Sequence, residues 1–272
     1  MRPIRRALHN AGIGGPPGRG RADRYLVSVD AAKAGGGPDC ETARLFFEHD
    51  GAEIYKMVHY LTAYDREFAA FRKGFPLVDG THRPLRFLEI GVAHGGSMQF
   101  WQRVFGPDAA IWGVDNDPRC AALHVTGANV RIGSQADPDF LAAVVDEMGG
   151  VDIVLDDGSH MPKHQRTSFE TLFPLLSDGG VYAVEDLCSA YWLYYSGGYR
   201  RRGTFIETAK QLVDGMHAWY YKRQPAAIAR DANANIERIA FYDGMVFIQK
   251  RAHGRPISVK IGQPSFGAKK PR

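Results

Sequence analysis

Two apolar runs of the sequence end in side chains that could do chemistry together. These side chains are four carboxylates and one histidine: Asp156, Asp157, His160, Glu185 and Asp186. Crowded carboxylates repel one another unless a cation or a shared proton relieves them, and oxygen ligands suit a hard cation such as Mg²⁺. A histidine beside such a site can accept a proton near neutral pH. The five residues therefore predict a hard-metal site with a histidine base.

The sequence between these residues predicts how they come together. Residues 151–186 read as strand, helix and strand. The helical part has apolar side chains three and four positions apart, and Asp178-Gly179-Gly180 is expected to end it. A single crossover between parallel strands is right-handed, so neighbouring strands would place their carboxyl ends at one edge, roughly 4.8 Å apart. Ligands of open α/β sheets bind at that edge.

A second informative stretch covers residues 85–118. A predicted strand at 87–90 is followed by a turn that contains Gly91, Gly95 and Gly96, and a helix is expected from Ser97 onward. Glycine lets the backbone approach a ligand and adopt positive φ. The next predicted strand ends at Asp115, an acid that can accept ribose hydroxyls. The alternative of a plain βα turn with a surface Asp115 stays open.

The glycine turn does not favour a dinucleotide. It departs from the G-x-G-x-x-G spacing, and Glu89, just before it, suits an ammonium or sulfonium group better than a pyrophosphate. Ser134 and Gln135, after a short strand at 130–132, are candidates for hydrogen bonds to adenine edges. Generic loop polarity explains these two residues equally well.

Two aromatic segments flank the predicted site. Residues 41–74 are expected to form a helix or helix pair over the mouth of the sheet, where His59, Tyr60 and Tyr64 could reach a ligand or simply pack. The loop at 187–199 contains Tyr191 and Trp192 and could form a wall for a sugar or a mobile lid.

The C-terminal part of the sequence predicts antiparallel strands that complete the parallel sheet. Residues 204–221 read as an amphipathic helix. Two strands at 236–241 and 245–249 flank Tyr242-Asp243-Gly244 as a β-hairpin. The expected fold class is α/β, with a mainly parallel sheet, helices on both faces and a C-terminal antiparallel hairpin.

Composition indicates one large domain with basic appendages. Residues 1–40 are rich in Gly, Pro and Arg and are expected to be disordered, whereas residues 251–272 form a basic tail. The chain of 272 residues carries +4 overall; residues 1–40 carry +4 and residues 250–272 carry +7, so the remainder carries −7. The basic balance therefore does not indicate a nucleic-acid-binding face.

Targeting signals and cysteines indicate the compartment. No apolar run approaches the roughly 20 residues that span a bilayer, and the N-terminus lacks the apolar region of a secretory signal. The three cysteines are widely spaced, which suggests reduced thiols in a cytoplasmic protein.

Five motifs together resemble a known family: LEIGVAHGGS, GVDNDP, LDDGSH, VEDL and FYDGMVFIQK. They are similar to class I S-adenosylmethionine-dependent methyltransferases, and most of all to the metal-dependent sugar O-methyltransferases of natural-product biosynthesis, of the mycinamicin, elloramycin and rhamnosyl type. The resemblance covers residues 45–250 and implies a Rossmann-like seven-stranded sheet. We divide the chain accordingly into residues 1–40, a methyltransferase domain with a helical cap at 41–250, and the tail at 251–272.

The resemblance also implies roles for individual residues. Asp157, Glu185 and Asp186 would hold Mg²⁺, His160 would be the base, and His164 is the competing base. The expected cofactor site comprises Glu89, Gly91, Gly95, Ser97, Asp115, Ser134, Gln135 and Asp156. The expected substrate contacts are Tyr60, Tyr64, His164, Tyr191 and Trp192.

The predicted function is Mg²⁺-dependent methylation of a sugar hydroxyl on a glycosylated natural product, with S-adenosylmethionine as donor. A homo-oligomer without nucleic-acid or membrane partners is expected. One alternative is a catechol or phenol O-methyltransferase, which uses the same acids with a lysine or water as base. A non-catalytic accessory protein of a hydroxylase system and an NAD-dependent oxidoreductase are further alternatives, the latter disfavoured by the glycine turn.

Overall fold

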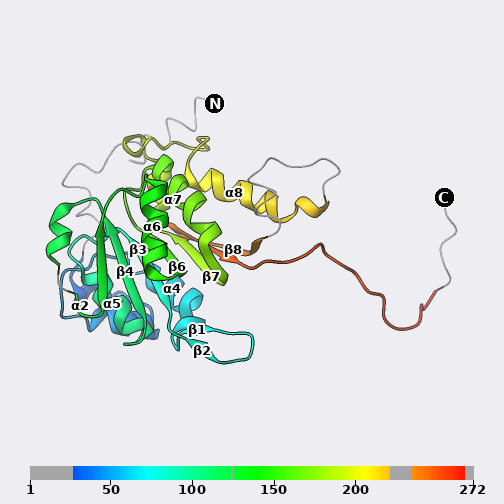
Figure 1. The fold of residues 1–272 in the computed structure, drawn as a ribbon, viewed down its shortest axis with the longest axis horizontal. Helices are drawn as coiled ribbons and strands as arrows, with labels where there is room; N and C mark the ends of the chain where they lie inside the picture. The colour runs from blue at the N-terminus through cyan, green and yellow to red at the C-terminus, as the bar shows by residue number, and fades with distance from the viewer. Residues whose placement is uncertain (1–26, 124, 221–234, 267–272) are drawn as a thin grey trace.

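The computed structural model describes residues 27–123, 125–220 and 235–266. A seven-stranded sheet crosses this part of the chain in the order β5-β4-β3-β6-β7-β9-β8 (Figure 1). Its strands are β3 (Arg86–Ile90), β4 (Ala110–Asp115), β5 (Ala128–Ile132), β6 (Val151–Asp156), β7 (Leu176–Val184), β8 (Ile236–Tyr242) and β9 (Met245–Lys250).

The pairing of the strands confirms the predicted fold class. Strands β5, β4, β3, β6 and β7 are parallel neighbours, whereas β9 runs antiparallel between β7 and β8. The β8–β9 hairpin turns at Asp243 and Gly244, as the sequence predicted. The βαβ unit across residues 151–186 also forms as expected, so the carboxyl ends of β6 and β7 lie side by side.

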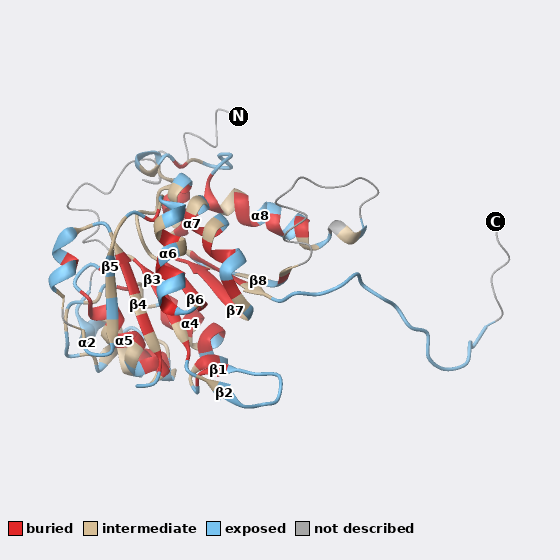
Figure 2. Ribbon diagram, viewed as in Figure 1, coloured by how far each residue is buried: buried red, intermediate tan, exposed pale blue. Residues whose placement is uncertain are grey.

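Helices cover both faces of the sheet. One face packs against α3 (Glu41–Phe47), α4 (Tyr60–Phe68) and α5 (Gly96–Phe105), and the other against α6 (Pro138–Met148), α7 (Pro162–Leu175) and α8 (Phe205–Met216). The central strands are buried by both layers (Figure 2). Because neighbouring residues of a strand point to opposite faces, Phe87 joins the first core and Leu88 the second.

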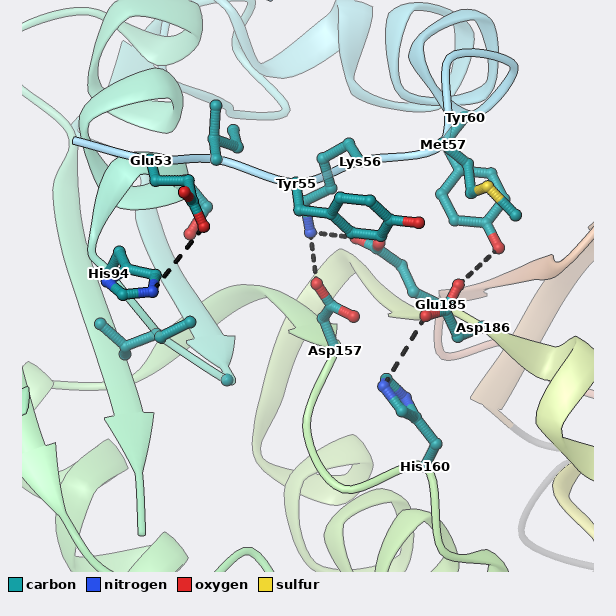
Figure 3. Close-up of a pocket in the computed structure, with 15 residues that line it drawn as sticks. Glu53, Tyr55, Lys56, Met57, Tyr60, His94, Asp157, His160, Glu185 and Asp186 are labelled. Carbon is teal, nitrogen blue, oxygen red and sulfur yellow. Dashed lines mark hydrogen bonds and ion pairs between the residues drawn. The ribbon is translucent and has the colours of Figure 1, made fainter. Parts of the chain in front are cut away.

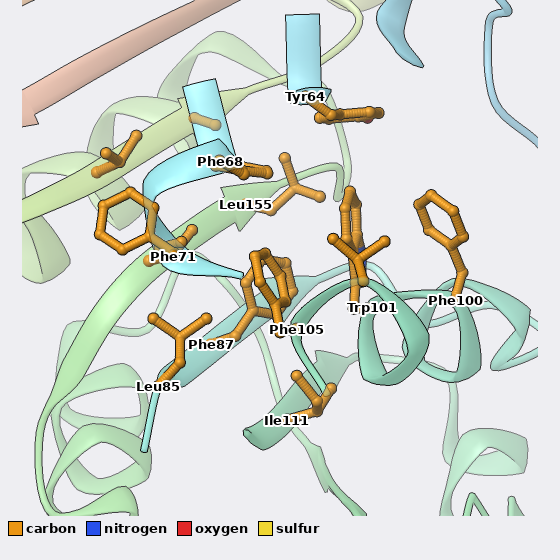
Figure 4. Close-up of a cluster of buried hydrophobic side chains, with 14 of the residues drawn as sticks. Tyr64, Phe68, Phe71, Leu85, Phe87, Phe100, Trp101, Phe105, Ile111 and Leu155 are labelled. Carbon is orange, nitrogen blue, oxygen red and sulfur yellow. The ribbon is translucent and has the colours of Figure 1, made fainter. Parts of the chain in front are cut away.

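An aromatic cluster fixes α4 and α5 to the first face (Figure 4). The ring of Tyr64 lies 5.0 Å from Trp101 and 5.8 Å from Phe68, and Trp101 lies 5.2 Å from Phe87. Buried aromatic pairs at such distances stabilise beyond the area they bury. The cluster therefore holds α4 rigidly above the sheet, with the hydroxyl of Tyr64 directed to the carboxyl edge.

Two sequence-based boundaries need correction. Residues 48–59, predicted within a helix or helix pair, are not helical; α3 and α4 end and begin on either side of an extended segment. Asp178-Gly179-Gly180 does not end α7, which stops at Leu175. These residues lie within β7, where the register with β6 shifts and Gly179 takes a φ of 89°.

Shorter elements complete the described part of the chain. They are α2 (Val29–Ala34), the two-residue strands β1 (Phe75–Pro76) and β2 (His82–Arg83), and five 3₁₀ turns: η2 (Ala69–Phe71), η3 (Pro118–Ala122), η4 (Leu187–Tyr191), η5 (Leu193–Tyr195) and η6 (Ala218–Tyr220). Helix α2 lies within the segment expected to be disordered, whose residues 1–26 fall outside the described part, as do residue 221 and residues 267–272.

Beyond β9 the chain leaves the sheet. Residues 251–266 form an extended, exposed segment that runs away from the body (Figure 1). None of the helices in the described ranges has both the length and the apolar character that crossing a membrane requires.

Candidate active site

A cavity of about 310 Å³ opens at the carboxyl edge of the central strands. Three parts of the chain line it. The first is the segment at 53–57 with Tyr60, the second is the turn at 91–94 with Ser97, and the third is a set of four residues after β6 and β7: Asp157, His160, Glu185 and Asp186. The predicted glycine turn and the predicted acids therefore share one cavity.

The glycine turn is dictated by close packing. Gly91 has a φ of 99°, and a Cβ there would overlap the carbonyl oxygen of Asp157. Gly95, with a φ of 82°, precedes α5. A Cβ on Gly96 would overlap the carbonyl oxygens of Ala52 and Glu53. The glycines thus let the turn touch both the acid loop and the segment at 53–57.

Asp115 fixes the shape of this turn. One carboxylate oxygen accepts hydrogen bonds from the backbone nitrogens of Val92 and Ala93, at 2.9 and 3.0 Å, and the other accepts from Asp117 at 2.9 Å. The acid after β4 therefore lies beside the glycine turn, as predicted. It also orders the turn backbone, which the sequence analysis did not anticipate.

Glu89 lies beneath the turn rather than in the wall of the cavity. Its side chain is fully buried and accepts hydrogen bonds from the Ser97 hydroxyl at 2.6 Å and from the Trp101 indole at 3.1 Å. Burial raises the pKa of Glu89 to about 7, although a lysine nearby and these hydrogen bonds oppose the rise. Of the pair assigned to the cofactor site, Ser97 lines the cavity and Glu89 supports it.

Asp156 is turned away from the cavity. It is fully buried and accepts hydrogen bonds from Ser168, Tyr182 and Gln135 at 2.6, 3.1 and 3.0 Å. Consecutive residues at the end of a strand face opposite sides, so Asp156 points into the second core while Asp157 points to the cavity. The packing does not support the expected side-chain contact of Asp156 with a cofactor.

The two polar residues after β5 have structural partners. Gln135 accepts a hydrogen bond from the backbone of Ser159 at 2.6 Å, and Ser134 accepts one from Ala136 at 3.1 Å. Gln135 therefore ties the loop after β5 to the loop that carries Asp157. Their predicted role at an adenine ring stays a prediction.

Asp157, His160 and Asp186 converge. One ligand atom from each lies within 4.8 Å of the others, and His160 Nε2 is 3.7 Å from Asp186 Oδ2 (Figure 3). His160 and Asp186 have φ values of 55° and 51°, a left-handed conformation that costs non-glycine residues energy and recurs at functional sites. The Nδ1 atom of His160 is buried without a hydrogen-bond partner.

The sequence analysis missed Lys56, which lies among the acids. Its Nζ is 2.5 Å from Asp157 Oδ2, 2.9 Å from Glu185 Oε1 and 3.8 Å from Glu89 Oε1, and its side chain is 2% exposed. Figure 3 shows Lys56 reaching down from the segment at 53–57 to Asp157 and Glu185. The available signal was a single lysine in the otherwise apolar and aromatic stretch IYKMVHY.

Charge and burial compete in this cluster. Burial works against the ammonium of Lys56, but the carboxylates of Asp157, Glu185 and Glu89 together raise its pKa well above the usual value. Burial, with the nearby Asp157 carboxylate, raises the pKa of Glu185 well above its usual range. Such a cluster has more negative charge than one ammonium compensates.

The predicted substrate contacts divide into two groups. Tyr60 and Tyr64 are buried, and their hydroxyls donate to Asp186, at 2.8 Å, and to Glu185. Of these two, Tyr60 also lines the cavity. His164 Nδ1 lies 2.9 Å from the Ser159 hydroxyl, inside α7. His164 and the loop residues Tyr191 and Trp192 are not among the residues that line the cavity.

Comparison with known proteins bears on this arrangement. Residues 88–187 match the family model described as a methyltransferase domain. These residues include the glycine turn, Asp115 and the acids after β6 and β7. The chain carries a methyltransferase domain.

The chain is also similar to named O-methyltransferases. The chain is 33% identical over 252 residues to the 8-demethyl-8-alpha-L-rhamnosyl tetracenomycin-C 2'-O-methyltransferase of Streptomyces olivaceus, covering 88% of this chain and 61% of the relative. It is 32% identical over 209 residues to the mycinamicin VI 2''-O-methyltransferase of Micromonospora griseorubida, covering 72% and 49%. The chain thus spans less than two thirds of these relatives.

A solved structure shares the fold. It is the MycE methyltransferase of the mycinamycin biosynthetic pathway, in complex with Mg, S-adenosylhomocysteine (SAH) and mycinamycin VI. It superposes with a TM-score of 0.67 at 29% sequence identity, covering 82% of this chain and 57% of that one. The methyltransferase domain of this chain therefore has the architecture of an enzyme that was crystallised with a metal and the product form of the methyl donor.

Proposed function

We propose that the protein is a divalent-metal-dependent O-methyltransferase that transfers a methyl group from S-adenosylmethionine to a sugar hydroxyl of a glycosylated natural product. The observation that carries the proposal is the placement of the glycine turn and the Asp157–His160–Asp186 cluster in one cavity. A methyl donor and a deprotonated acceptor must meet within contact distance, and this cavity brings their two predicted binding regions together.

The residues fit a hard divalent cation. Asp157 and Asp186 supply carboxylate oxygens, with Glu185 beside them, and oxygen ligands at a site that keeps water positions are typical of Mg²⁺. Burial and the neighbouring Asp157 carboxylate raise the pKa of Glu185, and a cation at this place would oppose that rise. When bound, the cation would lower the pKa of a coordinated hydroxyl.

The turn fits the methyl donor. Asp115 is fixed beside the backbone of Val92 and Ala93, where it can accept the ribose hydroxyls. Gly91 and Ser97 line the same wall. The buried Glu89 beneath them would add negative potential to this wall of the cavity whenever it is ionised.

In the proposed reaction His160 is the base. His160 Nε2 lies 3.7 Å from Asp186 Oδ2, and the other Asp186 oxygen accepts a hydrogen bond from Tyr60, so the imidazole lies beside the acids in the cavity wall. His160 takes the hydroxyl proton while the acceptor oxygen forms a bond to the methyl carbon. The carbon–sulfur bond breaks, and its electron pair stays on sulfur, which leaves as a neutral thioether.

The names of similar proteins support the proposal that the acceptor is a sugar hydroxyl. Several similar proteins carry names that specify a sugar hydroxyl of a polyketide glycoside. The alternative of a catechol O-methyltransferase with a lysine base gains no support from Lys56, because three carboxylates surround its ammonium group. We propose Tyr191 and Trp192 as outer substrate contacts of a loop that follows Asp186.

The test is methyl transfer with and without metal. Incubation with labelled S-adenosylmethionine and a panel of rhamnosylated and deoxysugar-bearing polyketides should label a sugar, located by mass spectrometry. EDTA should abolish the transfer, and Mg²⁺ should restore it, while binding of the methyl donor survives. Transfer to catechols alone, or full activity in EDTA after dialysis, contradicts the proposal.

We also infer a cytoplasmic homo-oligomer. Cys40, Cys120 and Cys188 are free thiols, which is typical of a reducing compartment. The homo-oligomer is an expectation taken from the family resemblance alone, and light scattering after size exclusion tests it.

A further inference from the structure

Lys56 occupies a place that a bound cation would also favour. Its ammonium lies between Asp157 Oδ2 and Glu185 Oε1, at 2.5 and 2.9 Å. These two residues belong to the set that the proposed function assigns to the metal. Figure 3 shows that Lys56 approaches them from the segment at 53–57, opposite the side from which His160 approaches Asp186.

Because Lys56 is buried, its charge interacts strongly with the neighbouring carboxylates. Its side chain is 2% exposed, and that of Glu185 is also 2% exposed. Screening by water is weak at such a site, so charges a few ångströms apart interact far more strongly than on the surface. A buried ammonium with three carboxylates within 4 Å stabilises them, and it repels any second cation placed beside the same oxygens.

The lysine is held in this position by its surroundings. The segment that carries it is anchored at Ala52, whose backbone nitrogen donates to Gln99 at 2.8 Å and whose carbonyl lies 2.7 Å from His49 Nε2. Gly96 leaves room for that backbone on α5. Lys56 is therefore a fixed part of the cluster.

We propose that Lys56 is a positioning residue that orders Asp157 and Glu185 before a metal binds and lowers the affinity of the cluster for a divalent cation. This inference rests on the proposed metal site. The ammonium of Lys56 has two opposed effects: it stabilises the crowded acids, and the same charge weakens metal binding. A chain without this charge gains metal affinity and loses stability.

The experiment measures Mn²⁺ binding, with the free-ion electron paramagnetic resonance signal as readout. The variants are Lys56→Met and Lys56→Gln, and the matched control is Lys210→Met, which removes an exposed lysine paired with Glu207 on α8. Both Lys56 variants should bind Mn²⁺ at least tenfold more tightly than the wild type, while Lys210→Met should be unchanged. The second Lys56 variant retains a polar group, in case the first does not fold.

The rise in melting temperature that Mg²⁺ induces is a readout that a purely structural role of Lys56 would not change. Without metal, the Lys56 variants should melt below the wild type, because buried carboxylates lose their counter-charge. Saturating Mg²⁺ should raise their melting temperature by more than it raises that of the wild type, since tighter binding stabilises more. An equal Mg²⁺-induced rise in all proteins overturns the inference.

The outcomes separate this inference from the proposed function. If the wild type binds no Mn²⁺, or if Asp157→Asn binds it equally well, the metal site of the proposed function fails. If the wild type binds Mn²⁺ through Asp157 but the Lys56 variants bind with equal or lower affinity, the metal site stands and the role of Lys56 is wrong.

Discussion

Tyr64 donates its hydroxyl hydrogen to the same Glu185 oxygen that Lys56 reaches, at 2.9 Å from the lysine. Tyr64 comes from α4, and the aromatic cluster holds its ring. The acid after β7 is therefore held from the helical layer by two donors, one neutral and one charged.

Tyr64→Phe is expected to lower the free energy of unfolding by about 2 kcal/mol. The substitution would leave a buried acceptor of Glu185 with one donor fewer, and a buried polar group without its partner costs roughly 1–3 kcal/mol. Urea denaturation measures the change, with Tyr194→Phe on the exposed loop as control. Equal stability of the two variants would show that the Tyr64 hydroxyl contributes little.

His160→Asn is expected to reduce turnover by roughly 10²–10⁴-fold, as typically follows the loss of a general base. Asparagine tolerates the left-handed backbone that His160 adopts, so this variant removes the imidazole with little added strain. Binding of the methyl donor should be unchanged by calorimetry. His164→Asn is the control, and a larger loss in that variant would transfer the role of base to His164.

Asp115→Asn is expected to weaken binding of S-adenosylmethionine about tenfold or more. The amide keeps the size of the carboxylate but loses its charge and one acceptor, and charged hydrogen bonds contribute roughly 1.5–3 kcal/mol each. Titration calorimetry measures the affinity. Asp117→Asn is the control, because that neighbouring carboxylate is engaged by Arg119 instead. Unchanged affinity in a folded Asp115 variant would exclude a ribose contact.

Glu89→Gln is expected to flatten the pH dependence of stability. The folded protein holds a proton on Glu89 up to about pH 7, whereas the unfolded chain releases it near the ordinary value of 4.5. The unfolded state therefore binds fewer protons in this window, and stability falls as the pH rises from 4.5 to 7. The shift corresponds to a loss of about 3 kcal/mol.

Urea denaturation of the wild type and of Glu89→Gln at several pH values isolates this contribution, because the other titrating groups are shared. The wild type should lose stability relative to the variant between pH 5 and 7. Parallel curves would mean that Glu89 is ionised throughout this range in the folded protein.

Rules that apply to neighbouring strands and helices predicted well which acids meet at the site. The handedness of a βαβ crossover and the common edge of parallel strands were enough to bring Asp157 near Asp186. The alternation of side chains along a strand would also have separated Asp156, the last residue of β6, from Asp157, which follows it. That rule was available from the sequence, and the assignment of Asp156 to the cofactor did not use it.

These local rules could not predict the position of Lys56. Its partners are 101 and 129 residues away in the chain, and the apolar spacing around it favoured a helix. The segment is extended because its backbone is anchored to Gln99 and its lysine to the acids. Such tertiary contacts override local propensity and have no short-range pattern.

The origin of Lys56 outside residues 88–187 has a consequence for how the domain acquires its native state. The acids after β6 and β7 are local to one βαβ unit, but their counter-charge arrives only when the chain around residue 56 closes over the sheet. Loop closure over such separations is slow compared with helix and hairpin formation. We therefore expect the acid edge to be completed late in folding, and a fragment that begins at β3 would leave Asp157 and Glu185 without their ammonium partner.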